Sequence, residues 1–209
     1  MWYFVTAFYY FCSGIIGYLL GSLSPSAMFA KMKNKDLRKA GTKNMGATNA
    51  LLLLGKGYGA AVMLLDMAKA VLAVRLAELL FPSLALAGYI AGCTAVFGHV
   101  FPLYMKFKGG RGLASFGGFV LAVDWKVFLM LLVLGLILMI VVNYSFVMPF
   151  SAAFFFPILE VLKTKSVSVC LITLAASVLI IMKHWVNAVK AKEGNDFKIR
   201  DFIKDKIFS

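Results

Sequence analysis

The chain has 209 residues, of which 62% are hydrophobic, and its mean hydropathy is +0.88. Soluble domains are about 45–50% apolar, so this composition excludes an ordinary soluble protein and indicates one membrane-embedded domain over residues 1–209. The net charge is +13, but the chain has no soluble domain that could bring this charge to a nucleic acid. Nucleic acid is therefore excluded as a partner.

The apolar runs predict seven transmembrane helices, so the expected fold class is an all-α polytopic membrane protein. The predicted helices cover residues 2–23, 59–80, 83–103, 112–123, 127–142, 146–162 and 167–186. The first run has no basic segment before it and no clear cleavage site after it, which favours a retained helix over a signal peptide. The fourth is short and begins in glycines, which is typical of a half-helix or a tilted segment.

The basic residues gather in residues 31–56 and in a tail from about residue 187. Cytoplasmic loops carry an excess of lysine and arginine, and anionic headgroups attract them. With seven spans, this bias predicts an N-terminus outside and a C-terminus in the cytoplasm. On this topology Lys163 and Lys165 lie on the outer side of the membrane, which is a minor exception to the charge bias. The basic residues toward the C-terminus are Lys183, Lys190, Lys192, Lys198, Arg200, Lys204 and Lys206.

Residues 41–49 have the sequence GTKNMGATN and precede an apolar stretch. Thr42, Asn44 and Asn49 offer hydroxyl and amide donors, and Gly46 lets a backbone N–H group approach a ligand. An ordinary turn followed by a helix N-cap has the same composition, because Thr and Asn are good caps. Both interpretations stay open on this segment alone.

Residues 98–115 have the sequence GHVFPLYMKFKGGRGLAS. A glycine-rich loop that enters a helix N-terminus is a natural anion site, and basic side chains strengthen it. The spacing is not that of a Walker loop. A basic loop that only sets topology would need no glycines. The candidate phosphate ligands here are Lys108, Gly109, Gly110, Arg111, Gly112 and Ser115.

Two polar pairs lie inside predicted helices, each with a spacing of three residues that puts both side chains on one face. His184 and Asn187 lie near the cytoplasmic end of the last helix, where a cap or a solvated histidine is the commoner alternative. Asp66 and Lys69 lie in the second predicted helix and are expected to neutralise each other as a structural pair. The three cysteines have no metal-ligand spacing, so no metal is expected.

Together these segments resemble the bacterial acyl-phosphate:glycerol-3-phosphate acyltransferases, the PlsY family. The resemblance covers, in the family's order, GSLSP at 21–25, DLRKAGTKNMGATN at 36–49, LLDMAK at 64–69, GHVFPLYMKFKGGRGLAS at 98–115 and HWVN at 184–187. It implies a seven-helix enzyme of the inner (plasma) membrane whose active site faces the cytoplasm. Such an enzyme transfers a fatty acyl group from acyl phosphate to the 1-hydroxyl of sn-glycerol 3-phosphate, giving lysophosphatidic acid for phospholipid synthesis.

The resemblance also implies roles for residues and partners. The expected partners are acyl phosphate, glycerol 3-phosphate and membrane lipids, without a metal or cofactor. The general base is a substrate phosphate or His184, and the sequence leaves that choice open. The expected catalytic residues are Thr42, Asn44, Asn49, His184 and Asn187. The expected phosphate-binding residues are Lys43, Gly46, Lys108, Gly109, Gly110, Arg111, Gly112 and Ser115.

The chain departs from the family pattern at phosphate-binding positions. Lys43 stands where glycine is usual, and Arg111 stands where lysine is usual. Leu52 and Asn143 replace arginines, and one charge-assisted hydrogen bond is worth about 1.5–3 kcal/mol. Two alternatives therefore remain, namely the same fold with a changed donor or acceptor, and a non-catalytic membrane protein that binds phosphate-bearing lipids. Lys43 is the best substitute for a missing arginine.

Overall fold

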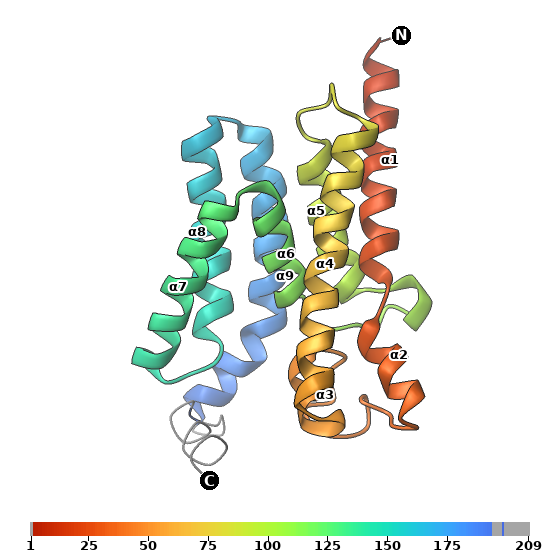
Figure 1. Ribbon diagram of the computed structural model, residues 1–209. Coiled ribbons are helices and arrows are strands. Elements are labelled where there is room, and N and C mark those ends of the chain that lie inside the picture. The colour runs from red at the N-terminus through yellow and green to blue at the C-terminus, as the bar shows by residue number, and fades with distance from the viewer. Residues whose placement is uncertain (1, 194–197, 199–209) are drawn as a thin grey trace. The chain divides into compact units, whose positions relative to one another are not determined.

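The computed structural model describes residues 2–193 and 198, and over these residues every regular element is helical. This confirms the all-α class. Arg200, Lys204 and Lys206 of the predicted basic tail lie outside the described residues. The elements are α1 (Trp2–Ser22), α2 (Pro25–Met32), α3 (Ala47–Leu54), α4 (Lys56–Leu80), α5 (Ala87–Val100), the 3₁₀ turn η1 (Leu103–Met105), α6 (Leu113–Val123), α7 (Trp125–Val142), α8 (Val147–Thr164) and α9 (Val167–Lys192) (Figure 1).

Each of the seven predicted apolar runs contains a helix, but several boundaries differ. The third predicted helix starts at Ala87 and not at residue 83, because consecutive turns follow α4 at Pro82. In these turns the N–H group of Leu84 donates to the carbonyl of Phe81 at 3.0 Å. The last helix, α9, continues past residue 186 to Lys192.

Two short helices, α2 and α3, were not predicted. In α2, Pro25 occupies the first turn and the hydroxyl of Ser24 accepts a hydrogen bond from the backbone N–H of Ala27. Serine before a first-turn proline is a strong start signal for a helix. Only eight residues follow it, which is too short for the apolar periodicity that revealed the longer helices.

Four described segments are long and apolar enough to cross a membrane by length and composition, and Leu113–Val123 is a shorter apolar helix. The segments are Tyr3–Met32, Trp125–Val142, Val147–Thr164 and Val167–Lys192. The helix α4 has the length of a span, but Asp66, Lys69 and other charged residues interrupt its apolar sequence. The count of seven spans stays a prediction.

The helices divide at Asp124 into two compact units, and each is described by itself. The first unit holds α1 to α6, and the second holds α7 to α9. The prediction of one membrane domain therefore stays a prediction.

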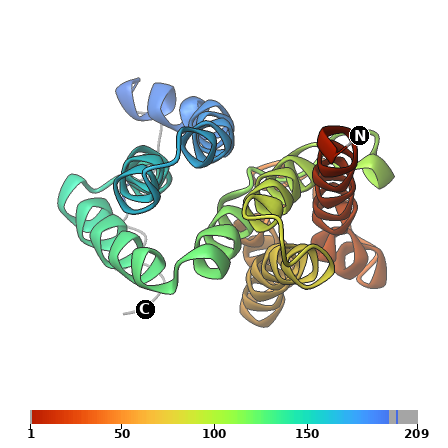
Figure 2. The ribbon, with the colours of Figure 1, turned by 90° about the horizontal axis from the view of Figure 1, so that it is seen from above.

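In the first unit, α1 packs along α5 through small residues, and α4 contacts α1, α5 and α6 (Figures 1 and 2). A Cβ atom on Gly21 would lie 2.1 Å from the carbonyl oxygen of Ala95, and one on Gly98 would lie 2.3 Å from that of Tyr18. Small residues at such contacts let two helix backbones approach closely, as membrane helices commonly do. The hydroxyl of Tyr18 also donates to the carbonyl of Phe101 at 2.8 Å. The end of α5 is thereby fixed against α1.

In the second unit, α8 packs against both α7 and α9. A Cβ atom on Gly135 of α7 would lie 3.0 Å from the side chain of Met148 on α8, so these two helices also approach closely. The buried face of α9 includes Ala176, Ile180 and His184, each four residues from the next. His184 therefore belongs to the buried face of α9.

Candidate functional site

Three sequence motifs far apart in the chain meet at one end of the first unit. There α2 and α3 lie together, and the loop that follows α5 runs beside α2 (Figure 1). The hydroxyl of Ser26 donates to the carbonyl of Met45 at 3.0 Å. A Cβ atom on Gly110 would also lie 3.0 Å from that carbonyl oxygen. Residues 41–49 and the glycine-rich loop are thus in direct contact through the backbone of Met45.

Asn49 is fully buried and organises the segment that precedes α3. Its amide nitrogen donates to the carbonyls of Leu37 at 2.7 Å and Ala40 at 3.2 Å. Its amide oxygen accepts the backbone N–H of Thr42 at 2.8 Å. An asparagine amide has two N–H donors, so both are already used. Contact between this amide nitrogen and a substrate would require breaking one of these bonds. Asn49 therefore shapes the loop, and its predicted catalytic role stays a prediction.

The turn at residues 41–44 exposes two of the predicted site residues. Gly41 and Lys43 have φ angles of +61° and +55°, in the left-handed region. Glycine adopts this region without strain, whereas lysine pays about 1 kcal/mol or more. This accounts for the family's glycine at position 43. Thr42 and Lys43 are both exposed, and Asn44 is half-buried.

The glycine-rich loop follows the end of α5 so closely that it leaves no room for side chains at two positions. The N–H group of Gly110 donates to the carbonyl of His99, and that of Gly109 donates to the carbonyl of Val100, both at 3.2 Å. A Cβ atom on Gly109 would lie 2.0 Å from the carbonyl oxygen of His99. Lys108 beside them is exposed and Arg111 is half-buried.

Besides α4, which starts after Gly55, two helices that lie in the predicted phosphate-binding motifs begin at a glycine without a side-chain cap. They are α3, which starts after Gly46, and α6, which starts after Gly112 with a φ angle of +89°. The first N–H groups of a helix have no partner inside the helix, and together they attract anions. The arrangement therefore offers two helix N-termini, each next to a lysine-bearing loop, that suit phosphate groups.

Ser115 lies in the first turn of α6 but faces α4. It is fully buried, and its hydroxyl donates to the carbonyl of Asp66 at 3.1 Å. A serine hydroxyl has a single donor. A phosphate bond from this hydroxyl would require that hydrogen bond to break, and the predicted phosphate-binding role of Ser115 stays a prediction.

A cluster of three buried polar side chains lies directly behind the glycine-rich loop. The ammonium of Lys69 lies 2.8 Å from Oδ1 of Asp66 and 3.0 Å from Nδ1 of His99, and it donates to the carbonyl of Leu23 at 2.6 Å. Asp66 is 2% exposed, while Lys69 and His99 are each 7% exposed. The expected Asp66–Lys69 pair is present, and it includes His99 as a third member.

His184 and Asn187 belong to the second unit. His184 is buried and Asn187 is half-buried, one turn apart on α9. Beside them Trp185 stacks on Phe150 of α8, with ring centroids 6.2 Å apart and an interplanar angle of 16°. Their predicted catalytic roles stay predictions.

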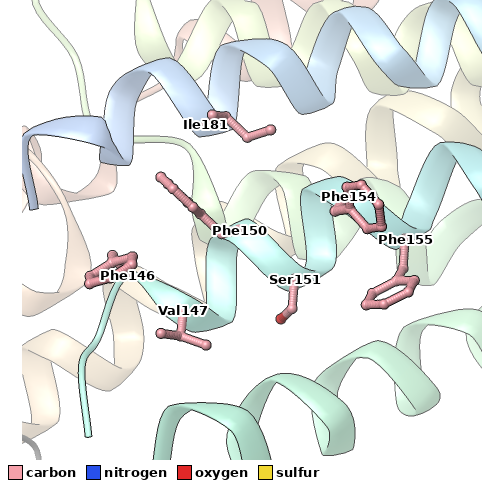
Figure 3. Close-up of a pocket in the computed structure, with 7 residues that line it drawn as sticks. All are labelled: Phe146, Val147, Phe150, Ser151, Phe154, Phe155 and Ile181. Carbon is pink, nitrogen blue, oxygen red and sulfur yellow. The ribbon is translucent and has the colours of Figure 1, made fainter. Parts of the chain in front are cut away.

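An apolar groove runs along α8 in the same unit, with a volume of about 400 Å³. Figure 3 shows Phe150 directed from α8 toward α9, where Ile181 lies, and Phe154 and Phe155 further along α8. Ile181 precedes His184 by three residues, so the groove and His184 share one face of α9. The remaining lining residues are Phe146, Val147 and Ser151.

Sequence reasoning missed three members of the first unit's site, namely His99, Ser26 and the carbonyl of Met45. The sequence contains a partial signal for His99, because it follows Gly98 at the start of the glycine-rich motif. Nothing in the spacing links His99 to Asp66 and Lys69, since about thirty residues separate them and only the packing of α5 on α4 joins them.

The chain is similar to known glycerol-3-phosphate acyltransferases along most of its length. The family model described as glycerol-3-phosphate acyltransferase matches residues 11–194. A glycerol-3-phosphate acyltransferase of Prochlorococcus marinus subsp. pastoris is 35% identical over 192 residues, which is 90% of this chain and 96% of the relative. One from Coxiella burnetii is 36% identical over 188 residues, covering 89% of this chain and 96% of the relative.

Two crystal structures of PlsY, an integral membrane glycerol 3-phosphate acyltransferase, have the same fold. The glycerol 3-phosphate form matches with a TM-score of 0.83 and 30% identity, over 91% of this chain and 95% of that one. The lysophosphatidic acid form matches with a TM-score of 0.81 and 29% identity, over 90% of this chain and 94% of that one. The chain therefore belongs to the glycerol-3-phosphate acyltransferase family.

Proposed function

We propose that this chain transfers a fatty acyl group from acyl phosphate to the 1-hydroxyl of sn-glycerol 3-phosphate, giving lysophosphatidic acid and inorganic phosphate. The observation that carries the proposal is the pair of uncapped helix N-termini at Gly46 and Gly112, in one unit and beside Lys43 and Lys108. Both substrates carry a phosphate, so each N-terminus has a ligand. The names of the relatives and the two ligand forms of PlsY support the acceptor and the product.

The chemistry requires orientation more than acid catalysis. The 1-hydroxyl oxygen attacks the acyl carbonyl carbon, and the bond from that carbon to the phosphate oxygen then breaks. Phosphate is a good leaving group, so the protein needs to align the hydroxyl and stabilise the tetrahedral oxyanion. The hydroxyl proton passes to a substrate phosphate or to His184. Thr42, Asn44 and Asn187 are the proposed hydrogen-bonding residues.

The two phosphate positions have different surroundings, which suggests an assignment. The glycine-rich loop carries Lys108 and Arg111 and is proposed to bind the phosphate of the acyl donor. The turn at residues 41–46 carries Lys43 and is proposed to bind glycerol 3-phosphate. Arginine binds phosphate through two parallel hydrogen bonds, and lysine binds it as a point charge.

The groove on α8 suits a lipid acyl chain. Its lining is apolar and largely aromatic, and Ile181 places one wall on the face of α9 that carries His184. A fatty chain buried there gains about 0.8 kcal/mol for each methylene removed from water. We propose that a lipid acyl chain lies along Phe150 and Phe154 in this unit.

The proposed location is the inner (plasma) membrane, with seven spans, the N-terminus outside and the C-terminus in the cytoplasm. The lysine-rich residues 31–56 support this orientation through the positive-inside rule. The active site then faces the cytoplasm, where glycerol 3-phosphate and acyl phosphate are expected. The single membrane domain is part of the same proposal.

A second function is favoured by one specific observation. Leu52 on α3 is 46% exposed and stands where the family has an arginine, so this position supplies no charge to a phosphate. A changed acceptor, a changed donor such as acyl-CoA, or a non-catalytic protein that binds phosphate-bearing lipids would each tolerate that loss. Asn143 has a different explanation, because its φ angle of +68° closes α7, and asparagine tolerates this conformation better than arginine does.

The test is an assay of the purified protein in detergent. Acyl phosphate and acyl-CoA are supplied in parallel as donors, with glycerol 3-phosphate and glycerol as acceptors. Lysophosphatidic acid formed from acyl phosphate and glycerol 3-phosphate supports the proposal. Product from acyl-CoA alone favours the changed donor, and binding without turnover favours the non-catalytic protein.

A further inference from the structure

We infer that His99 is a positioning residue for the glycine-rich phosphate loop, and that Asp66 and Lys69 hold it in place. The inference rests on the proposed function, because it assigns the loop to a substrate phosphate. Its starting point is the buried cluster behind that loop. Charged groups within a membrane protein are costly and mark functional sites.

The contacts of the cluster favour one tautomer of His99. An ammonium has three N–H donors, and three acceptors surround that of Lys69. These acceptors are Oδ1 of Asp66 at 2.8 Å, the carbonyl of Leu23 at 2.6 Å and Nδ1 of His99 at 3.0 Å. In the tautomer that carries its proton on Nε2, Nδ1 of His99 accepts a hydrogen bond from Lys69.

The opposite tautomer is worse in this geometry. With a proton on Nδ1, His99 would donate to Oδ1 of Asp66, which lies 3.2 Å away. One N–H group of Lys69 would then point at another N–H group across 3.0 Å. With the proton on Nε2, Lys69 donates to Nδ1 and to the carbonyl of Leu23, and it forms an ion pair with Asp66.

The Nε2 edge of His99 borders the glycine-rich loop. A Cβ atom on Gly110 would lie 2.2 Å from Nε2, so the ring occupies the space that a side chain at position 110 would fill. The backbone carbonyl of His99 also accepts the N–H group of Gly110 at 3.2 Å. His99 therefore fixes Gly110 through both its ring and its backbone, and Gly110 in turn touches the carbonyl of Met45.

Stabilisation of the fold alone is a weak explanation for a buried polar cluster of this kind. Replacing a buried ion pair by apolar residues is often neutral or stabilising, whereas removing one partner is strongly destabilising. The cluster connects α4 to the loop that precedes α6, and it does so through the ring of His99, which borders Gly110. The function that the geometry assigns to it is control of the loop's position.

The first test is His99→Asn. The shorter amide retains an oxygen near the position of Nδ1 that accepts from Lys69, but it lacks the Nε2 edge that contacts Gly110. We expect the dissociation constant for inorganic phosphate, measured by titration calorimetry on the full chain in detergent, to rise about tenfold. The KM for the substrate whose phosphate the loop binds should rise about tenfold, with kcat within about twofold of the parent value.

If His99 only stabilises the fold, its substitution gives a different result. It would lower the fraction of folded protein, and hence kcat, while the phosphate dissociation constant and KM of the folded fraction stay at the parent values. That outcome overturns the inference.

A second variant covers the case in which His99→Asn does not fold. The double substitution D66N/K69M removes both charges and the donor to Nδ1 while retaining the His99 ring. The phosphate dissociation constant should rise at least about fivefold. An unchanged constant in a folded D66N/K69M protein overturns the inference.

A double-mutant cycle gives the sharpest test of contact. Gly110→Ala adds a methyl group against Nε2 in the parent, and His99→Asn removes that edge. The fold-change in the phosphate dissociation constant of the double variant should be at least about threefold smaller than the product of the two single fold-changes. A fold-change equal to that product contradicts the inference. Calorimetry needs no turnover, so an inactive parent that shows this coupling would refute only the proposed reaction.

Discussion

The side-chain oxygen of Asn49 accepts the backbone N–H of Thr42 at 2.8 Å, which ties the turn before α3 to the first turns of that helix. The same side chain donates to two carbonyls of residues 37–40. One buried amide thus controls the path of the whole turn that exposes Thr42 and Lys43.

Asn49→Asp tests this control. A carboxylate can accept the Thr42 N–H group but cannot donate to the carbonyls of Leu37 and Ala40. We expect the free energy of unfolding to fall by about 2 kcal/mol or more, because buried acceptors lose their partners. Thermal unfolding in detergent measures this. Thr48→Ala is the control, since Thr48 is exposed on the same helix and should change little. Equal melting temperatures for the two variants would contradict the role of Asn49.

Lys43→Ala tests whether Lys43 takes the place of a missing arginine as a ligand of the acceptor's phosphate. If Lys43 binds the acceptor, its loss weakens the transition state by about 1.5–3 kcal/mol, the range for a charge-assisted bond. That corresponds to about 10–100-fold in kcat/KM for glycerol 3-phosphate. Lys39→Ala is the control, because an exposed charge paired with Asp36 at 3.9 Å contributes little. Similar kinetics for the two variants would show that Lys43 is not the ligand.

Lys43→Gly separates charge from backbone strain. The φ angle of +55° at position 43 is unfavourable for lysine and alanine alike and is free of strain for glycine. The glycine variant should lose as much kcat/KM as the alanine variant while melting at a higher temperature. A glycine variant that melts below the alanine variant would contradict the left-handed turn.

Gly110→Ala tests the glycine-rich loop. The added methyl group would meet Nε2 of His99 at 2.2 Å and the carbonyl of Met45 at 3.0 Å. We expect KM for acyl phosphate to rise several-fold, with a smaller rise for glycerol 3-phosphate. Gly57→Ala is the control, since a Cβ atom there meets nothing within 4 Å. A rise confined to glycerol 3-phosphate would reassign the loop to the acceptor.

Cysteine labelling tests the orientation in the membrane. In a protein whose Cys12, Cys93 and Cys170 are replaced by serine, a new cysteine is placed at Asp124 or at Lys192. An impermeant reagent added outside intact cells should label Asp124→Cys and leave Lys192→Cys unlabelled, because lysine-rich segments stay in the cytoplasm. The reverse pattern would contradict both the topology and the cytoplasmic active site.

The sequence was sufficient for the long helices and for the motifs, but not for their contacts. Long apolar runs such as that of α7 predict helices because only a helix satisfies its backbone in lipid. The eight-residue α2 was missed because it is too short to show periodicity. His99 was missed because its partners on α4 come from packing, and the link between Met45 and Gly110 is through a backbone carbonyl, which no residue type reveals.

The most direct measurement follows both products of one reaction. Purified protein is given acyl phosphate and radiolabelled glycerol 3-phosphate, and lysophosphatidic acid and inorganic phosphate are quantified together over time. The proposed reaction releases one phosphate for each labelled lysophosphatidic acid, and it should give little product when glycerol replaces glycerol 3-phosphate. Phosphate release without labelled lipid, or labelled lipid formed from acyl-CoA and not from acyl phosphate, would contradict it.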